Sequence, residues 1–155
     1  MSQSQIHLLI ADDMLPIREY LSMMLSYEPD LKIVGSVDSG ALAVEKALSL
    51  KPKVVLMDIE METPDAGIKA IGELSVRAPE IKSVVLTHFS NHETVFAAFE
   101  AGAVDYIIKN SSAAEILESV RAAAYDKTAI RPQIAKLIRT EFRALRSERN
   151  KLIAT

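Results

Sequence analysis

The chain has 155 residues, of which 49% are hydrophobic and 25% charged, and its formal net charge is −3. This length favours one globular domain over two, and the absence of cysteine excludes disulfide frameworks, thiolate nucleophiles and Cys-ligated zinc. The apolar runs are far shorter than a membrane span and the N-terminus has no secretion-signal pattern, so we expect a cytoplasmic protein.

Two kinds of apolar pattern alternate along the first 130 residues. Short runs rich in Ile, Val and Leu predict strands buried on both faces, at residues 5–11, 31–37, 53–58, 81–87 and 104–109. Segments of helical period predict helices at residues 15–26, 41–50, 67–77, 94–101 and 113–125, with Ser39 and Asn91 as N-caps. We expect an α/β fold: a doubly wound, five-stranded parallel sheet in the order 2-1-3-4-5 with helices on both faces.

The last 25 residues differ in charge from the rest of the chain. From residue 131 onward seven basic residues face two acidic ones, a net charge of +5, which leaves −8 for residues 1–130. We therefore predict a domain over residues 1–130 and a separate basic segment over residues 131–155. Apolar residues at spacings of three and four between residues 133 and 152 predict one amphipathic helix in this segment.

Three interpretations of this C-terminal helix remain open. It could be a solvated linker, a dimerisation helix, or a direct contact to nucleic acid through its arginines. A linker that also dimerises is favoured, because one helix cannot form a helix-turn-helix and aromatic residues for stacking on bases are scarce.

Polar residues with chemical potential follow four of the five predicted strands. Asp12 and Asp13 follow the first, Asp58 ends the third, Thr87 ends the fourth and Lys109 ends the fifth. Ligands of open parallel sheets bind beyond the carboxyl ends of the strands, where these side chains would converge. Three clustered carboxylates repel one another unless a cation neutralises them, and hard oxygen ligands suit Mg²⁺ or Mn²⁺.

This predicted cluster favours phosphoryl chemistry. Asp58, central in the cluster, is suited to attack a phosphoryl group and form an aspartyl phosphate. The metal ion and Lys109 would offset charge on the transferring oxygens, and the Thr87 hydroxyl would hydrogen-bond the attached group. Taken singly, Asp12 or Asp13 would more readily be interpreted as a helix cap, and Thr87 as an ordinary strand residue. The convergence of the whole set favours the site.

At this point the chain resembles the response-regulator receiver domain of two-component signalling, over roughly residues 5–126. The resemblance is carried by "DD" at Asp12 and Asp13, "LMDIEM" around Asp58, "VVLT" ending in Thr87, and "GAVDYIIKN" with Tyr106 and Lys109. It implies that Asp58 receives its phosphoryl group from a sensor histidine kinase. It also implies that Asp13, Asp58 and the backbone carbonyl of Glu60 hold Mg²⁺, with Asp12 assisting through water.

The resemblance further implies a signalling role for two residues. Thr87 and Tyr106 would form a switch pair, in which the aromatic ring turns inward as the threonine moves toward the phosphoryl group. The protein is then expected to be a self-phosphorylating switch and not a turnover enzyme, with a homodimer as its assembly. A DNA-binding output domain is expected to continue beyond residue 155, so that DNA would be contacted only through that domain.

Two alternatives to this function stay open. A stand-alone receiver would act through protein contacts of its fourth and fifth helices. An aspartyl-phosphate phosphatase of the dehalogenase type is disfavoured, because such enzymes place aspartates two positions apart after the first strand, whereas Asp12 and Asp13 are adjacent.

The sequence departs from the family pattern near two site residues. Proline directly after the methionine of the phosphoacceptor loop is typical, but here Glu62 follows Met61, the proline is Pro64, and Gly67 comes one residue late. Lys109 precedes Asn110 where the family has a cis-linked proline, so we expect a trans peptide. His88 replaces a small residue after Thr87 and is predicted to alter the phosphoryl lifetime.

Overall fold

The structure is a computed structural model that describes residues 4–154. Five strands form one parallel sheet in the order β2-β1-β3-β4-β5, as predicted. The strands are β1 (Ile6–Ala11), β2 (Leu31–Val37), β3 (Val54–Met57), β4 (Lys82–Thr87) and β5 (Asp105–Ile108). The helices are α1 (Leu15–Ser26), α2 (Gly40–Leu50), α3 (Ala66–Arg77), α4 (His92–Ala101), α5 (Ala113–Ala124) and α6 (Pro132–Ala154).

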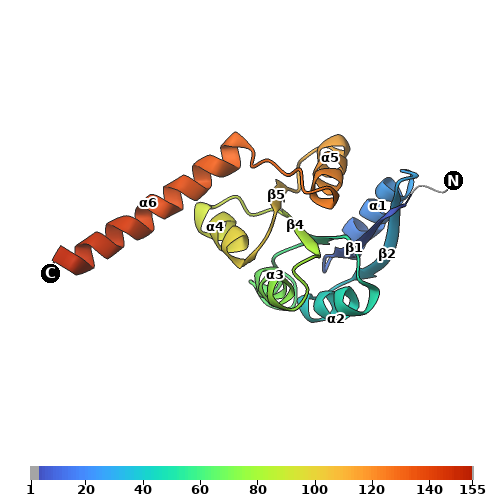
Figure 1. Cartoon of the computed structure of the whole chain (residues 1–155), viewed down its shortest axis with the longest axis horizontal. Helices are drawn as coiled ribbons and strands as arrows, with labels where there is room; N and C mark the ends of the chain where they lie inside the picture. Colours follow the sequence, from blue (N-terminus) through green and yellow to red (C-terminus); the bar gives the residue numbers. More distant parts are fainter. Residues whose placement is uncertain (1–3, 155) are drawn as a thin grey trace.

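The helices cover both faces of the sheet, because the central strands are apolar on both sides. All four residues of β3 are buried, and alternate residues enter different cores. Val55 and Met57 pack with α2, α3 and α4, whereas Val54 and Leu56 pack with α1 and α5. This two-layer cover holds the carboxyl ends of β1, β3, β4 and β5 along one edge (Figure 1).

Helix boundaries agree with the sequence prediction to within two residues, and one of the two predicted caps forms. The hydroxyl of Ser39 accepts a hydrogen bond from the Leu42 amide at 3.1 Å, as an N-cap should. Asn91 lies at the N-cap position of α4, but its side-chain amide donates to Glu93 at 3.1 Å and does not cap the helix. Asn91 therefore occupies the predicted N-cap position, but the predicted capping hydrogen bond does not form.

The C-terminal helix α6 begins on the body of the domain and extends away from it (Figure 1). Ile134 in its first turn is 3% exposed and belongs to the core that α2, α3 and α4 share. Just before α6, the Arg131 guanidinium donates to the Tyr106 carbonyl at 2.9 Å and lies 3.3 Å from the Asp105 carboxylate. The segment that the charge pattern separates at residue 131 is thus packed against β5 and α4 over its first turns.

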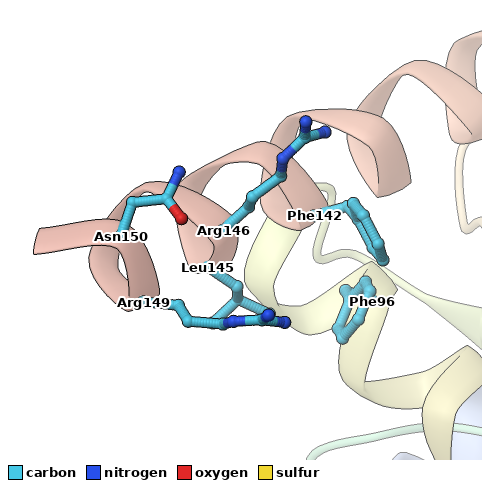
Figure 2. A pocket seen from close by; sticks show the side chains of 6 residues that line it. All are labelled: Phe96, Phe142, Leu145, Arg146, Arg149 and Asn150. Carbon is cyan, nitrogen blue, oxygen red and sulfur yellow. The ribbon is translucent and has the colours of Figure 1, made fainter. Parts of the chain in front are cut away.

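Further along, α6 and α4 enclose an apolar groove. His92 Nδ1, at the start of α4, lies 2.6 Å from a carboxylate oxygen of Glu141. Beyond this pair, Phe96 of α4 faces Phe142 and Leu145 of α6 across a groove of about 450 Å³ (Figure 2). Arg146, Arg149 and Asn150 complete its lining. The predicted amphipathic helix therefore has a docked N-terminal part and an exposed C-terminal part, in which Leu152 is 78% exposed.

Candidate phosphoacceptor and metal site

The carboxylates predicted from the strand ends meet in space. Asp12 and Asp58 are the first residues after β1 and β3, and the Asp58 amide donates to the Ala11 carbonyl at 2.9 Å. Both side chains are buried, at 2% and 5% exposure, while Asp13 is exposed. Asp12, Asp13 and Asp58 each offer a carboxylate oxygen, and these oxygens lie within 4.8 Å of one another. Such a group of hard ligands fits a divalent cation.

Lys109, the residue directly after β5, joins this cluster. Its ammonium nitrogen lies 2.7 Å from Oδ2 of Asp12 and 3.0 Å from Oδ2 of Asp58. The backbone that carries it is held by the sheet edge, since the Lys109 amide donates to the Thr87 carbonyl at 2.8 Å. The Lys109–Asn110 peptide is trans, as expected for a residue other than proline.

Burial and neighbouring charges shift the pKa values of Asp58 and Lys109. Burial raises the pKa of the Asp58 carboxyl, and the positive charge of Lys109 only partly offsets this effect. Burial lowers the pKa of Lys109, but its hydrogen bond to Asp12 and the charge of Asp58 outweigh burial, so its pKa lies above the usual value. One ammonium group thus serves two buried carboxylates, which leaves negative charge for a second cation to neutralise.

Thr87 provides a hydroxyl without a partner near this edge. It is the last residue of β4 and is fully buried, and Oγ1 has no hydrogen-bond partner among residues 4–154. A buried hydroxyl that makes no hydrogen bond costs about 1–3 kcal/mol. A ligand oxygen at this edge of the sheet would remove that cost.

Tyr106 of β5 makes a hydrogen bond to the loop that follows Thr87. The ring is fully buried on β5, with its centroid 6.4 Å from that of Phe99 in α4. Its hydroxyl donates to the Phe89 carbonyl in the loop between β4 and α4, at 2.8 Å. The aromatic ring therefore lies on the inner side, where it connects β5 to the loop that begins at Thr87.

The loop after Asp58 carries Glu60, whose carbonyl the resemblance assigns to the metal. Ile59 and Met61 on either side are buried in the core, and Glu60 between them is exposed. Gly67, the second residue of α3, lies so close to this loop that a Cβ at its position would be 1.9 Å from the Asp58 carbonyl oxygen. The late glycine of the sequence is thus required by a close approach of two backbones. His88 is exposed and lines an open cleft together with Glu60 and Pro64.

Three contacts around the site are not evident from the sequence pattern. Glu62 binds the start of α2, at 2.6 and 2.9 Å from two backbone amides. Asp105 is 4% exposed on β5 and accepts hydrogen bonds from Ser119 and the Tyr106 amide. Its signal was an acidic residue inside a strand with an otherwise apolar pattern, which requires a buried partner. The third is the 2.6 Å contact between His92 Nδ1 and a carboxylate oxygen of Glu141 in α6.

Comparison with known proteins shows that the sequence is similar to those of signalling proteins. The response regulator receiver domain profile matches residues 8–121. The transcriptional regulatory protein LiaR of Bacillus subtilis is 34% identical over 138 residues, which are 89% of this chain and 65% of LiaR. The chain therefore spans less than two thirds of this relative.

No helix among the described residues has the length and apolar character needed to cross a bilayer.

Solved structures show the same fold. The response regulator domain of Thermotoga maritima CheB superposes with a TM-score of 0.72 at 34% identity, covering 78% of this chain and 97% of that one. A LuxR-family two-component response regulator from Aurantimonas sp. SI85-9A1 superposes with a TM-score of 0.81 at 25% identity, covering 89% and 98% of the two chains.

Proposed function

Since the chain belongs to the response regulator receiver domain family, we propose that it is a phosphorylation-controlled switch in which Asp58 accepts a phosphoryl group from a sensor histidine kinase. The observation that carries this proposal is the buried Asp58 carboxylate 3.0 Å from the Lys109 ammonium group, with carboxylates of Asp12 and Asp13 beside it. A buried nucleophile next to a fixed cation is the arrangement that phosphoryl transfer needs.

In the transfer, a carboxylate oxygen of Asp58 attacks the phosphorus atom of a phosphohistidine. The new P–O bond forms as the P–N bond breaks, and the histidine nitrogen of the kinase leaves with the electron pair. Lys109 is placed to bind an oxygen of the transferring group through a charge-assisted hydrogen bond. Asp13, Asp58 and the Glu60 carbonyl, with Asp12 through water, would hold Mg²⁺ or Mn²⁺. When bound, this ion offsets charge on the phosphoryl oxygens.

The signal would pass from Asp58 through Thr87 and Tyr106. The unpaired Thr87 hydroxyl gains an acceptor once a phosphoryl group is attached nearby, which favours its movement toward Asp58. That movement pulls on the loop from His88 to Asn91, which Tyr106 holds through the Phe89 carbonyl. The loop leads directly into α4, on which α6 is docked.

The output would be a change in the surface formed by α4 and α6. We propose that this surface controls a homodimer and, through it, a DNA-binding output domain, because the similar LiaR is a transcriptional regulatory protein and this chain spans 65% of it. A stand-alone receiver that acts on another protein through α4 and α5 is the second candidate. Phe142 and Leu145, 59% and 43% exposed, are apolar residues that a dimer contact would cover.

Two experiments test these proposals. Incubation with Mg²⁺ and acetyl phosphate should label one site per chain and then stop, whereas a phosphatase would consume many equivalents. For assembly, light scattering after size exclusion should show a phosphorylation-dependent dimer that Leu145→Glu weakens. This substitution is preferable to deleting residues 131–155, because the deletion would also remove buried Ile134 from the core.

A further inference from the structure

The side chain of Glu62 connects the loop between β3 and α3 to the N-terminus of α2. The carboxylate of Glu62 accepts hydrogen bonds from the Gly40 amide at 2.6 Å and from the Ala41 amide at 2.9 Å. The hydroxyl of Ser39 accepts from the next amide, Leu42. The first three amides of α2 are thus satisfied, two of them by a residue more than 20 positions away in the sequence. A carboxylate at a helix N-terminus is also favoured by the helix dipole.

The rest of this loop is equally constrained. Ile59 and Met61 are buried, at 2% and 9% exposure, and the Ile59 carbonyl accepts from the Gly67 amide at 2.8 Å. The first residue of α2 lies close to the first residue of α3. A Cβ on Gly40 would be only 2.7 Å from the Ala66 carbonyl oxygen. Glu60 is the exposed residue between these buried anchors. The contacts of Ile59, Met61 and Glu62 therefore restrict the movement of the Glu60 backbone carbonyl.

Glu62 stands where the family pattern has a proline directly after the methionine. Proline fixes the backbone angle φ of a loop covalently. At position 62 no proline ring fixes φ, and the Glu62 side chain instead makes two charge-assisted hydrogen bonds to the start of α2. The residue that departs from the family pattern is thus the same residue that caps α2 from a distant position in the sequence.

We propose that Glu62 is a positioning residue for the divalent metal ion: by clamping the β3–α3 loop onto α2, it holds the Glu60 carbonyl at the edge where Asp13 and Asp58 lie. This inference rests on the proposed function, since it assigns Glu62 to the metal requirement of the same site. Groups that orient metal ligands without touching the ion contribute about 10–100-fold to metal affinity in other proteins.

The test measures metal binding separately from phosphorylation. Mg²⁺ binding to the full unphosphorylated chain is measured by isothermal titration calorimetry for the wild type, Glu62→Ala and Glu62→Gln. In parallel, the rate of labelling by acetyl phosphate is measured against Mg²⁺ concentration. Glu73→Ala is the matched control, because Glu73 lines the same hollow between α2 and α3 but bonds Arg77 within its own helix.

We expect Glu62→Ala to weaken Mg²⁺ binding about tenfold, with the labelling rate at saturating Mg²⁺ within about twofold of the wild type. Glu62→Gln, which keeps one acceptor oxygen, should lie between, and Glu73→Ala should match the wild type. Amide exchange at Gly40 and Ala41 should accelerate in Glu62→Ala, which verifies that the clamp is broken.

Other results would overturn the inference. If Mg²⁺ affinity is unchanged while Gly40 and Ala41 exchange faster, Glu62 only caps α2. If the saturated labelling rate falls and Mg²⁺ affinity does not, Glu62 acts on the chemistry and not on the metal. If Glu62→Ala does not fold, Glu62→Gln decides by the same criteria. A wild type that binds Mg²⁺ but is never labelled would refute the proposed function while the calorimetric comparison still decides the role of Glu62.

Discussion

The ammonium nitrogen of Lys109 lies 3.0 Å from Oδ2 of Asp58, across a gap of 51 positions in the sequence. The same nitrogen is 2.7 Å from Asp12, so two buried carboxylates share one positive charge. This arrangement sets the charge balance at the carboxyl edge of the sheet. It keeps the carboxylate that we propose as the nucleophile beside a cation, and it leaves negative charge that a metal ion can neutralise.

Replacing Lys109 by alanine tests this balance. Removing one partner of a buried ion pair costs about 3–5 kcal/mol, because the remaining carboxylates face each other without compensation. Lys109→Ala should therefore lower the free energy of unfolding by about 3 kcal/mol without Mg²⁺, and by much less with saturating Mg²⁺. Urea denaturation with and without Mg²⁺ measures both values, with exposed Lys46→Ala as the control. A loss that Mg²⁺ does not reduce would contradict a shared cation site.

The unpaired hydroxyl of Thr87 gives a prediction of the opposite sign. Thr87→Val removes a buried oxygen that makes no hydrogen bond within residues 4–154. The free energy of unfolding should stay the same or rise by up to about 1 kcal/mol. Ser119→Ala, whose hydroxyl donates to buried Asp105, should instead lower it by about 1–3 kcal/mol. A large loss of stability in Thr87→Val would mean that the hydroxyl already has a structural partner.

Tyr106 carries a pH-dependent contribution. Burial raises the pKa of its hydroxyl well above the usual value of 10, and the negative charge of Asp58 adds to the effect. Above pH 10 the unfolded chain loses this proton while the folded chain keeps it, so stability falls as pH rises. Tyr106→Phe should cost about 1 kcal/mol at neutral pH through the lost bond to Phe89. It should also show a shallower loss above pH 10.

Thermal and urea unfolding from pH 7 to pH 11 would measure this difference. Tyr20→Phe serves as the control, because Tyr20 is 51% exposed. In Tyr106→Phe, amide exchange of residues 88–91 should also accelerate. Parallel pH curves for the wild type and Tyr106→Phe would show that the ring contributes by packing alone.

The docking of α6 can be tested along its length. Ile134→Ala should lower the free energy of unfolding by about 2–4 kcal/mol, because Ile134 is 3% exposed in the main core. Ile153→Ala should change it by less than about 0.5 kcal/mol, since Ile153 is 72% exposed. Equal effects at the two positions would mean that α6 is either wholly detached or wholly packed.

The sequence predicted the parts of this fold that depend on local pattern. Continuous apolar runs identified the five strands, and the residues that follow β1 and β3, such as Asp12 and Asp58, were expected at one edge because parallel strands end together. The structure brings Asp12, Asp58 and Lys109 together as the strand order requires. The roles assigned to these residues stay predictions.

What the pattern did not predict depends on tertiary contacts. The apolar stripe of α6 indicates an amphipathic helix, but its periodicity does not say that Ile134 enters the core beside α4 while Leu152 stays exposed. The bond of Glu62 to Gly40 spans 22 positions, and an exposed acidic residue in a loop gives no signal of such a partner. Side chains that bridge two elements are visible only once the elements are placed.

If Asp58 is the phosphoacceptor, intact-mass spectrometry will find a single phosphoryl group that depends on this residue. The full chain and Asp58→Asn are incubated with acetyl phosphate and Mg²⁺, and the labelled residue is then located by borohydride reduction and peptide mapping. We expect one phosphoryl group on each wild-type chain, located at Asp58, and none on Asp58→Asn. Equal labelling of both proteins, or a label on a residue away from this edge of the sheet, would contradict it.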